Sequence, residues 1–299
     1  MNLQDKSILI LGPRKGGTTL LQRLLDGAVI YVYPAELKIK LLLADTWVSK
    51  RNLIEKYRTL NRLRHEDLPG FNSKKYNELL EKSASCADSL RDLIICDLVA
   101  AIASSPCLMT DYCGWAVKEA GGDIDRIFSD WKMMFPDAKV LMIVRNPPFV
   151  TRAVFRSRRK KHKKLSVRTL LKQAIDPWRV FIKQSRYAKR DDTLIISYDC
   201  LVADTAKVMR KVCKFLSVEY GDTFCRPTLF GKDTIVKTSS RRLPYVYMDK
   251  SRLWKDMTMA EMTVTLCAWL FYGYVIRIFL GAPSYGSFRR SLATDTKLV

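Results

Sequence analysis

The sequence predicts an α/β fold in which one parallel β-sheet is flanked by helices. Short, continuously apolar runs such as residues 7–11 and 139–144 are typical of strands that are buried on both faces. Segments of helical spacing alternate with these runs, and glycine or proline turns separate them, as in parallel βαβ units. Hydrophobic residues make up 48% of the 299 residues, which is enough for a large core and excludes a disordered polycation.

In the N-terminal half, the apolar strand over residues 7–11 is broken by the glycine-rich segment 12–17, and helical spacing follows over 18–25. Further helical stretches are expected at residues 35–47, 52–64 and 76–102. We interpret the region from about 52 to 105 as a helical insert.

After this insert, turn residues precede a short strand over residues 115–118. Pro147 and Pro148 can open the basic helix that follows the strand 139–144, because proline is tolerated in the first turn. The other expected elements are a strand at residues 193–197 and helices at 123–135, 203–216 and 259–272. The simplest architecture is a single domain over 1–299, with a core of about 7–274 and a C-terminal tail of 275–299.

Positive charge is concentrated in one part of the chain. The sequence has 52 Lys and Arg against 30 Asp and Glu, a formal net charge of +22. Residues 145–190 hold sixteen Lys and Arg and one acidic residue, Asp176, so this window alone contributes +15. So local a charge indicates a polyanionic partner: nucleic acid, a phosphate-rich cofactor, an acidic substrate or a membrane surface.

The sequence predicts no metal site and no membrane anchor. The eight cysteines form no C-x-x-C pair, and the two histidines are His65 and His162. The first residues contain no apolar signal segment, so the expected location is cytoplasmic. The one stretch of membrane length, residues 262–282, contains Gly273, Arg277 and polar threonines, which disfavour a membrane span.

A glycine-rich loop joins the first strand to the first helix. Residues 12–19 have the spacing G-x-x-x-x-G-T-T, one substitution away from a Walker A loop. Loop amides and the positive end of the helix dipole form an anion cradle in this context, so we expect a P-loop-type sheet. Thr18 takes the place of the Walker lysine, and Lys15 lies inside the loop instead. This substitution disfavours a conventional ATPase or kinase. The structural alternative to an anion-binding loop is a glycine turn between strand and helix that binds no ligand.

Four segments, in the same order along the chain, resemble the sulfotransferases that use 3′-phosphoadenosine 5′-phosphosulfate (PAPS). Residues 12–21 (GPRKGGTTLL) resemble their 5′-phosphosulfate loop, with a lysine like that of heparan sulfate sulfotransferases. Residues 135–147 (FPDAKVLMIVRNP) resemble the strand and turn of their 3′-phosphate motif. Residues 196–202 resemble their "RYEDLV" segment, and residues 251–255 with the helix up to 274 resemble their "GRWK" loop and terminal helix. The resemblance implies a metal-free transferase that sulfates a hydroxyl or amine of a glycan, acidic peptide or small molecule.

The resemblance also implies roles on the 5′ side of the donor. Lys15 would place its ammonium on the bridging oxygen of the leaving group, and Lys118 would contact the sulfonate. Amides, hydroxyls and a guanidinium of the loop would hold the 5′-phosphate and sulfonate, from Arg14, Gly16, Gly17, Thr18 and Thr19.

Glu36 is the candidate general base. It lies nineteen residues after Gly17, where tyrosylprotein sulfotransferases resemble this chain and carry their catalytic glutamate. A first-turn carboxylate that the helix dipole stabilises is the structural alternative. Glu119 is the reserve base, although the heparan-type enzymes carry their glutamate before the lysine, where this chain has Val117.

On the 3′ side, Arg145 resembles the arginine that binds the 3′-phosphate. The serine expected eight residues later is Ala153 here, and Ser157 or Thr151 would have to substitute. Weakened donor binding or an altered donor therefore stays open. Tyr198 resembles a residue near the adenine. The residues that would close over the 3′-phosphate are Arg252 and Lys255, with Leu253 inserted in the pattern.

Two other classes of function stay open. A P-loop nucleotide or nucleoside kinase predicts magnesium-dependent turnover of ATP. A basic nucleic-acid-binding protein on an inactive sulfotransferase fold is conceivable because of Ala153, but residues 156–164, with seven cations in nine residues, lack interleaved aromatics and match no recognition module. That basic run is either a solvated helix face or a surface for an acidic acceptor. The resemblance makes residues 262–282 part of a closing helix, which disfavours a membrane partner.

Overall fold

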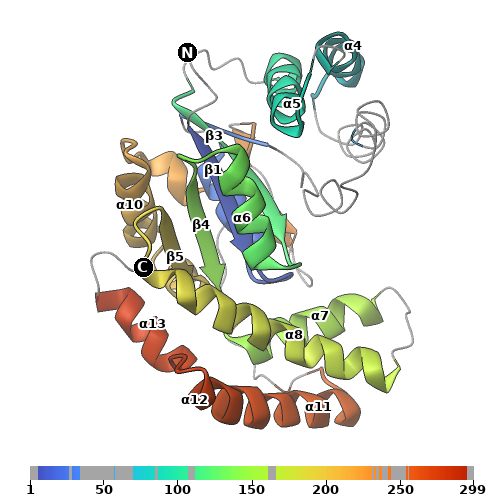
Figure 1. The fold of residues 1–299 in the computed structure, drawn as a ribbon, viewed down its shortest axis with the longest axis vertical. Helices are drawn as coiled ribbons and strands as arrows, with labels where there is room; N and C mark the ends of the chain where they lie inside the picture. The colour runs from blue at the N-terminus through green and yellow to red at the C-terminus, as the bar shows by residue number, and fades with distance from the viewer. Residues whose placement is uncertain are drawn as a thin grey trace.

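The fold is built around a five-stranded parallel sheet with the strand order β2-β3-β1-β4-β5 (Figure 1). The computed structural model describes residues 6–26, 29–33, 57, 70–84, 87–106, 112–160, 166–230, 232–233, 236–237, 242–243, 254 and 256–294. The strands of the sheet are β1 (Ser7–Gly12), β2 (Ile30–Val32), β3 (Gly114–Ala120), β4 (Lys139–Val144) and β5 (Thr193–Ser197). The predicted α/β class with a parallel sheet flanked by helices is confirmed.

Strand β1 shows why both faces of the sheet are covered. Its Leu9 and Leu11 belong to one apolar cluster, whereas Ile8 and Ile10 belong to a second cluster on the other face. Because successive side chains of a strand point to opposite faces, a continuously apolar strand needs helices on both sides.

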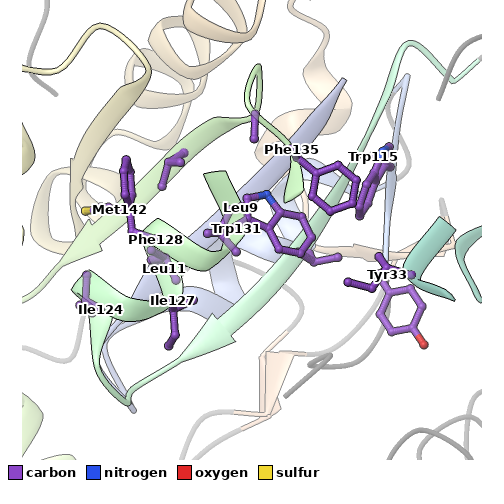
Figure 2. Close-up of a cluster of buried hydrophobic side chains, with 14 of the residues drawn as sticks. Leu9, Leu11, Tyr33, Trp115, Ile124, Ile127, Phe128, Trp131, Phe135 and Met142 are labelled. Carbon is purple, nitrogen blue, oxygen red and sulfur yellow. The ribbon is translucent and has the colours of Figure 1, made fainter. Parts of the chain in front are cut away.

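The first face is covered by α5 (Leu90–Ser104), α6 (Ile124–Met134), α8 (Val167–Ser185) and α13 (Tyr285–Thr294). At its centre, Trp115 of β3 packs edge-on against Trp131 of α6 and against Phe135, with ring centroids 5.6 and 5.3 Å apart (Figure 2). The second face is covered by α1 (Thr18–Leu25), α9 (Tyr198–Ala203) and α10 (Thr205–Leu216).

The prediction of one continuous helix over residues 76–102 is wrong, because the structure has two helices there. These are α4 (Ser73–Ala84) and α5, which lie between β2 and β3 in the chain. Ser89 ends the connection with a capping box: its hydroxyl accepts from the amide of Asp92 at 3.1 Å, and its own amide donates to the Asp92 carboxylate at 3.0 Å. The helices expected at 35–47 and 52–64 lie outside the described residues, apart from Tyr57.

The C-terminal part adds a helical layer at the lower edge of Figure 1. Helix α7 (Pro147–Arg159) begins at the predicted proline, and α11 (Met259–Leu270) begins at a capping box of Thr258 and Glu261. A π-helical turn (Phe271–Ile276) and α12 (Arg277–Phe279) continue it. Within the described ranges, no helix combines the length and the apolar character that crossing a membrane requires. The remaining elements are 3-10 turns at Arg186–Lys189 and Asp222–Cys225 and the antiparallel pairs β6 (Thr228–Leu229) with β7 (Lys232–Asp233) and β8 (Val236–Lys237) with β9 (Arg242–Leu243).

One buried carboxylate fastens α4 and α5 to the sheet. Asp97 of α5 is fully buried and accepts hydrogen bonds from the hydroxyls of Tyr33, at 2.7 Å, and of Tyr57 and Tyr76. Tyr33 directly follows β2, and its carbonyl oxygen accepts from Nε2 of Gln22 on α1 at 2.7 Å. The polar cluster therefore connects α4, α5 and the end of β2, which the apolar core also joins.

We expect this carboxylate to give the stability of the protein a pH dependence. Burial raises the pKa of Asp97 to about 6, and the three tyrosine hydroxyls oppose that rise. The folded state thus holds the proton more tightly than the unfolded state, so the stability from this group is full below about pH 4 and is lost as the pH rises through 6. Relative to Asp97→Asn, the free energy of unfolding of the wild type should fall by about 2 kcal/mol between pH 4 and pH 7. Urea unfolding of the wild type and of Asp97→Asn at pH 4 and pH 7 measures this change. The prediction is contradicted if the difference in stability between the two proteins is the same at both pH values.

Candidate active site at the carboxyl edge of the sheet

The central strands end at one edge of the sheet. Gly12 at the end of β1 is in register with Ala120 at the end of β3, and Val144 of β4 is in register with Ser197 of β5. Ligands of open α/β sheets bind in the crevice at the carboxyl ends of the strands. The loops that leave β1, β3, β4 and β5 are therefore the segments from which a site is built.

The loop after β1 turns tightly around Pro13. The amide of Gly16 donates to the Pro13 carbonyl at 2.8 Å, and Lys15, which is exposed, has a φ of 65°. A positive φ in a non-glycine residue is a strained backbone state that is concentrated at functional sites. Gly17 has a φ of 108° and caps α1, and a Cβ at this position would lie 2.3 Å from the Tyr198 ring. Glycine is needed there both for conformation and for space.

Two basic side chains, one from β3 and one from the loop itself, lie between the loop and the end of β3. Nζ of Lys118, which is 8% exposed, lies 3.2 Å from the hydroxyl of Thr19 on α1. The stem of Arg14 lies over Gly121, whose added Cβ would be 2.8 Å from Cγ of Arg14. With the amides at the start of α1, these cations make the loop a place for an anion.

Arg145 and Tyr198 close the loop from the β4 and β5 side. Nη1 of Arg145 donates to the carbonyl oxygen of Lys15 at 3.0 Å, and Cζ of Arg145 lies 4.3 Å from the centroid of the Tyr198 ring. The same ring packs against Gly17. Arg145 therefore holds the strained Lys15 backbone while it stacks on an aromatic ring, which fixes its guanidinium.

The structure brings nine of the predicted site residues to one place: Arg14, Lys15, Gly16, Gly17, Thr18, Thr19, Lys118, Arg145 and Tyr198. Ser157 lies on α7, ten residues after Pro147, which is roughly 15 Å along the helix. Thr151 is fully buried and donates to the Pro147 carbonyl at 3.1 Å, so its hydroxyl is used inside the helix. Glu36, Arg252 and Lys255 lie outside the described residues.

Two supporting residues went unnoticed in the sequence. Gln184 of α8 is buried and donates from Nε2 to the carbonyl of Ile143 at 3.0 Å, next to the end of β4. Gly121, with a φ of 74°, donates its amide to the Gly12 carbonyl at 2.8 Å and supports Arg14. The pair Gly121-Gly122 after a strand was a signal in the sequence for Gly121. No local signal indicates Gln184.

The basic helix α7 is partly used inside the protein. Arg159 forms an ion pair with Glu261 and a hydrogen bond with the carbonyl of Asp256. Arg152, which is 5% exposed, lies 3.6 Å from the carboxylate of Asp256. These two arginines fasten α7 to the start of α11, so part of the local charge has a structural function.

The comparisons with known proteins agree with this architecture. The model of a family described as "Sulfotransferase family" matches residues 7–222, which include the loop, Lys118, Arg145 and Tyr198. The solved sulfotransferase domain of the Synechococcus PCC 7002 olefin synthase is similar, with 18% identity, a TM-score of 0.58 and coverage of 88% of this chain and 94% of that domain. A sulfotransferase domain from the curacin biosynthetic pathway has 15% identity and a TM-score of 0.55, with 95% and 100% coverage. The search of curated proteins found no match.

Proposed function

The chain belongs to the sulfotransferase family, and on that premise we propose that it transfers the sulfuryl group of PAPS to a hydroxyl or amine of an acceptor by in-line displacement. One observation carries the proposal: Lys15 is exposed in a strained loop at the carboxyl edge of the sheet, and Arg145 binds its carbonyl. A loop with this lysine and with threonine in the Walker lysine position suits a sulfated nucleotide donor better than ATP with magnesium.

On the 5′ side, we assign the anion cradle to the loop and the start of α1. Amides of Gly16, Gly17 and Thr18 would hold the 5′-phosphate, and Arg14 would add a guanidinium fork. The donor supplies the sulfuryl group and the bisphosphate that leaves. Lys15 would neutralise the charge that develops on the bridging oxygen, and Lys118, beside Thr19, would orient the sulfonate.

On the 3′ side, we assign the 3′-phosphate to Arg145 and the adenine to the neighbourhood of Tyr198. The stacking of Arg145 on Tyr198 supports this assignment because it leaves the guanidinium fixed before the donor arrives. We propose that Ser157, Arg252 and Lys255 complete the 3′ side. Ala153 in place of the family serine removes one hydroxyl, so the share of donor affinity that Arg145 provides should be larger.

We propose Glu36 rather than Glu119 as the general base. The side chains of adjacent strand residues point to opposite faces of the sheet. Lys118 contacts Thr19 of α1 on one face, so Glu119, which is 1% exposed, belongs to the opposite face, where Val117 is part of the core. A base on that face is turned away from the loop that carries Lys15.

The basic surface of α7 is our proposed site for an acidic acceptor. Arg159 pairs with Glu261 and Arg152 with Asp256 inside the protein; Arg156 is partly exposed and Lys160 is exposed on the same helix. A sulfated or carboxylated acceptor would relieve the mutual repulsion of the cations in this run.

Nucleotide binding tests the proposed donor directly. Adenosine 3′,5′-bisphosphate should raise the melting temperature of the protein by several degrees at saturation, because a ligand that binds only the folded state stabilises it. ATP with magnesium should raise it less. In Arg145→Ala, affinity for the bisphosphate should fall by at least about tenfold, since a charge-assisted contact with the 3′-phosphate is lost.

Arg168→Ala is the matched control, because Arg168 is an exposed arginine of the same basic region on α8. It should bind the bisphosphate as the wild type does. Stabilisation by ATP with magnesium alone would replace this proposal with the kinase alternative. No stabilisation by either nucleotide would favour the nucleic-acid-binding alternative.

A further inference from the structure

The helix that runs from α11 through the π-helical turn to α12 has an unusual distribution of side chains. Its buried residues include Glu261, Thr265 and Ala268, which are 3%, 1% and 5% exposed. Its large apolar residues point the other way, since Met259, Leu270 and Ile278 are 74%, 54% and 67% exposed. A surface helix of a globular protein normally shows the opposite arrangement. The buried side is occupied by contacts to α8 and α7, so packing within the described part of the chain does not account for the apolar outer side.

We define the exposed stripe by its exposed side chains, which are Met259, Ala260, Thr263, Leu266, Cys267, Trp269, Leu270, Phe271, Tyr274, Val275, Ile278 and Leu280. Among the described side chains of this helix, no exposed one carries a charge. Arg277 lies at the margin, where its guanidinium donates to the carbonyls of Gly273, at 2.7 Å, and of Ala282, at 3.4 Å. From Met259 to Phe279 the helix is roughly 31 Å long, and the stripe follows this whole length.

Cations stand beside the exposed stripe on the neighbouring helices. On α8, which packs against α11, Arg168, Lys172 and Arg179 are exposed, and the guanidinium carbon of Arg179 lies 5.9 Å from the centroid of the Tyr272 ring. Helix α13, which follows α12 and turns upward at the left of Figure 1, adds the exposed Arg290, whereas the neighbours of Arg289 are Asp199 and Cys200 of α9. Glu261, the only acidic residue between 257 and 294, is buried against Arg159.

We infer that the exposed stripe is a docking surface for an anionic lipid membrane, on which the helix lies in the plane of the interface. Apolar residues with aromatic rings on one side and arginines beside them are the composition of interfacial helices. Trp269 and Tyr274 have amphipathic rings that suit the headgroup level, and the flanking cations suit anionic lipids. The docking differs from a membrane span, because the stripe would enter only the outer boundary of one leaflet.

The charge of the protein favours a membrane over a second copy of the chain. Two copies with a formal charge of +22 each repel one another, and symmetric contact through the stripe would also bring their flanking arginines together. An anionic bilayer satisfies both the apolar stripe and the cations. This inference does not depend on the sulfotransferase reaction, and it departs from the expectation from sequence, which disfavoured a membrane partner.

Vesicle binding tests the inference. The purified protein should sediment with large vesicles of phosphatidylcholine and phosphatidylglycerol, and much less with vesicles of phosphatidylcholine alone. Leu270→Asp with Ile278→Asp should lower the partition coefficient by at least about tenfold, because charges then replace apolar groups in the stripe. Both positions are mostly exposed, so the fold should stay intact, which circular dichroism checks. Met133→Asp, on α6 and 74% exposed, is the matched control and should bind as the wild type does.

A measurement on the unaltered chain makes the result independent of the double variant. Adding anionic vesicles should shift the tryptophan fluorescence to shorter wavelength, and Trp269→Phe should remove most of that shift. The inference is overturned if the wild type neither sediments with anionic vesicles nor changes its fluorescence, or if the stripe variant and Met133→Asp bind equally. It is also overturned if light scattering shows that the wild type is a dimer and the stripe variant is a monomer, since the stripe would then be a contact between copies.

Discussion

Lys15→Ala should lower kcat/KM for sulfuryl transfer by about 100- to 1000-fold, the usual cost of removing one preorganised donor from a developing negative charge. Lys15 is exposed, so its side chain adds little to the core, and alanine accepts the same backbone angles as lysine. The free energy of unfolding should therefore change by less than about 0.5 kcal/mol. Release of adenosine 3′,5′-bisphosphate from PAPS in the presence of acceptor measures the rate, and urea unfolding measures the stability.

Lys207→Ala is the matched control for this variant, because Lys207 is an exposed lysine on α10 that belongs to the surface. It should keep the rate of the wild type. If Lys15→Ala binds the bisphosphate normally and loses only the rate, then Lys15 acts on the leaving group. Unchanged turnover in Lys15→Ala would refute that role.

The largest effect on stability is expected for Asp97→Ala, which should lower the free energy of unfolding by about 3–5 kcal/mol at neutral pH. The change removes the acceptor that the hydroxyls of Tyr33, Tyr57 and Tyr76 share in the core, and the loss of a buried hydrogen-bond partner costs about 1–3 kcal/mol. It also removes a hydrogen-bond partner of Tyr33, whose carbonyl accepts from Gln22 of α1, the helix that follows the glycine-rich loop. Urea unfolding measures the change, and bisphosphate binding measures its effect on the loop.

Asp92→Ala on the same helix provides the comparison. Asp92 is exposed and contributes to the capping box with Ser89, so its loss should cost only about 1 kcal/mol. If Asp97→Ala costs no more than Asp92→Ala, the three tyrosines find other partners and the cluster does not fasten α4 and α5 to the sheet.

Segments with strong local signals were predicted well from the sequence. The strand at residues 139–144 coincides with β4, and Pro147 begins α7 as expected, because an apolar run and a proline act within a few residues. The prediction failed at residues 76–102, where the capping box of Ser89 and Asp92 lies inside one long helical pattern. Strand β2 was missed because three apolar residues, Ile30–Val32, are too short to show a period.

The candidate site was likewise predictable from the sequence only in part. The loop at residues 12–19 could be identified because its glycines, lysine and threonines are contiguous. The positions of Lys118 beside Thr19 and of Arg145 on the Lys15 carbonyl join residues that are 99 and 130 apart in the chain. Only a family resemblance could suggest those partners from sequence, since no local pattern couples such distant residues.

The class of fold, the glycine-rich loop at residues 12–19 and the excess of positive charge follow from the sequence, because each depends on residue types and on short spacings. The tertiary structure alone decided the distribution of that charge between Arg145 at the loop, Arg159 paired with Glu261, and the arginines of α8 and α13. It also decided which side of the apolar segment 262–282 is buried. Hydropathy measures how apolar a segment is, whereas exposure depends on which face the neighbouring helices cover, and that is fixed only when the chain folds.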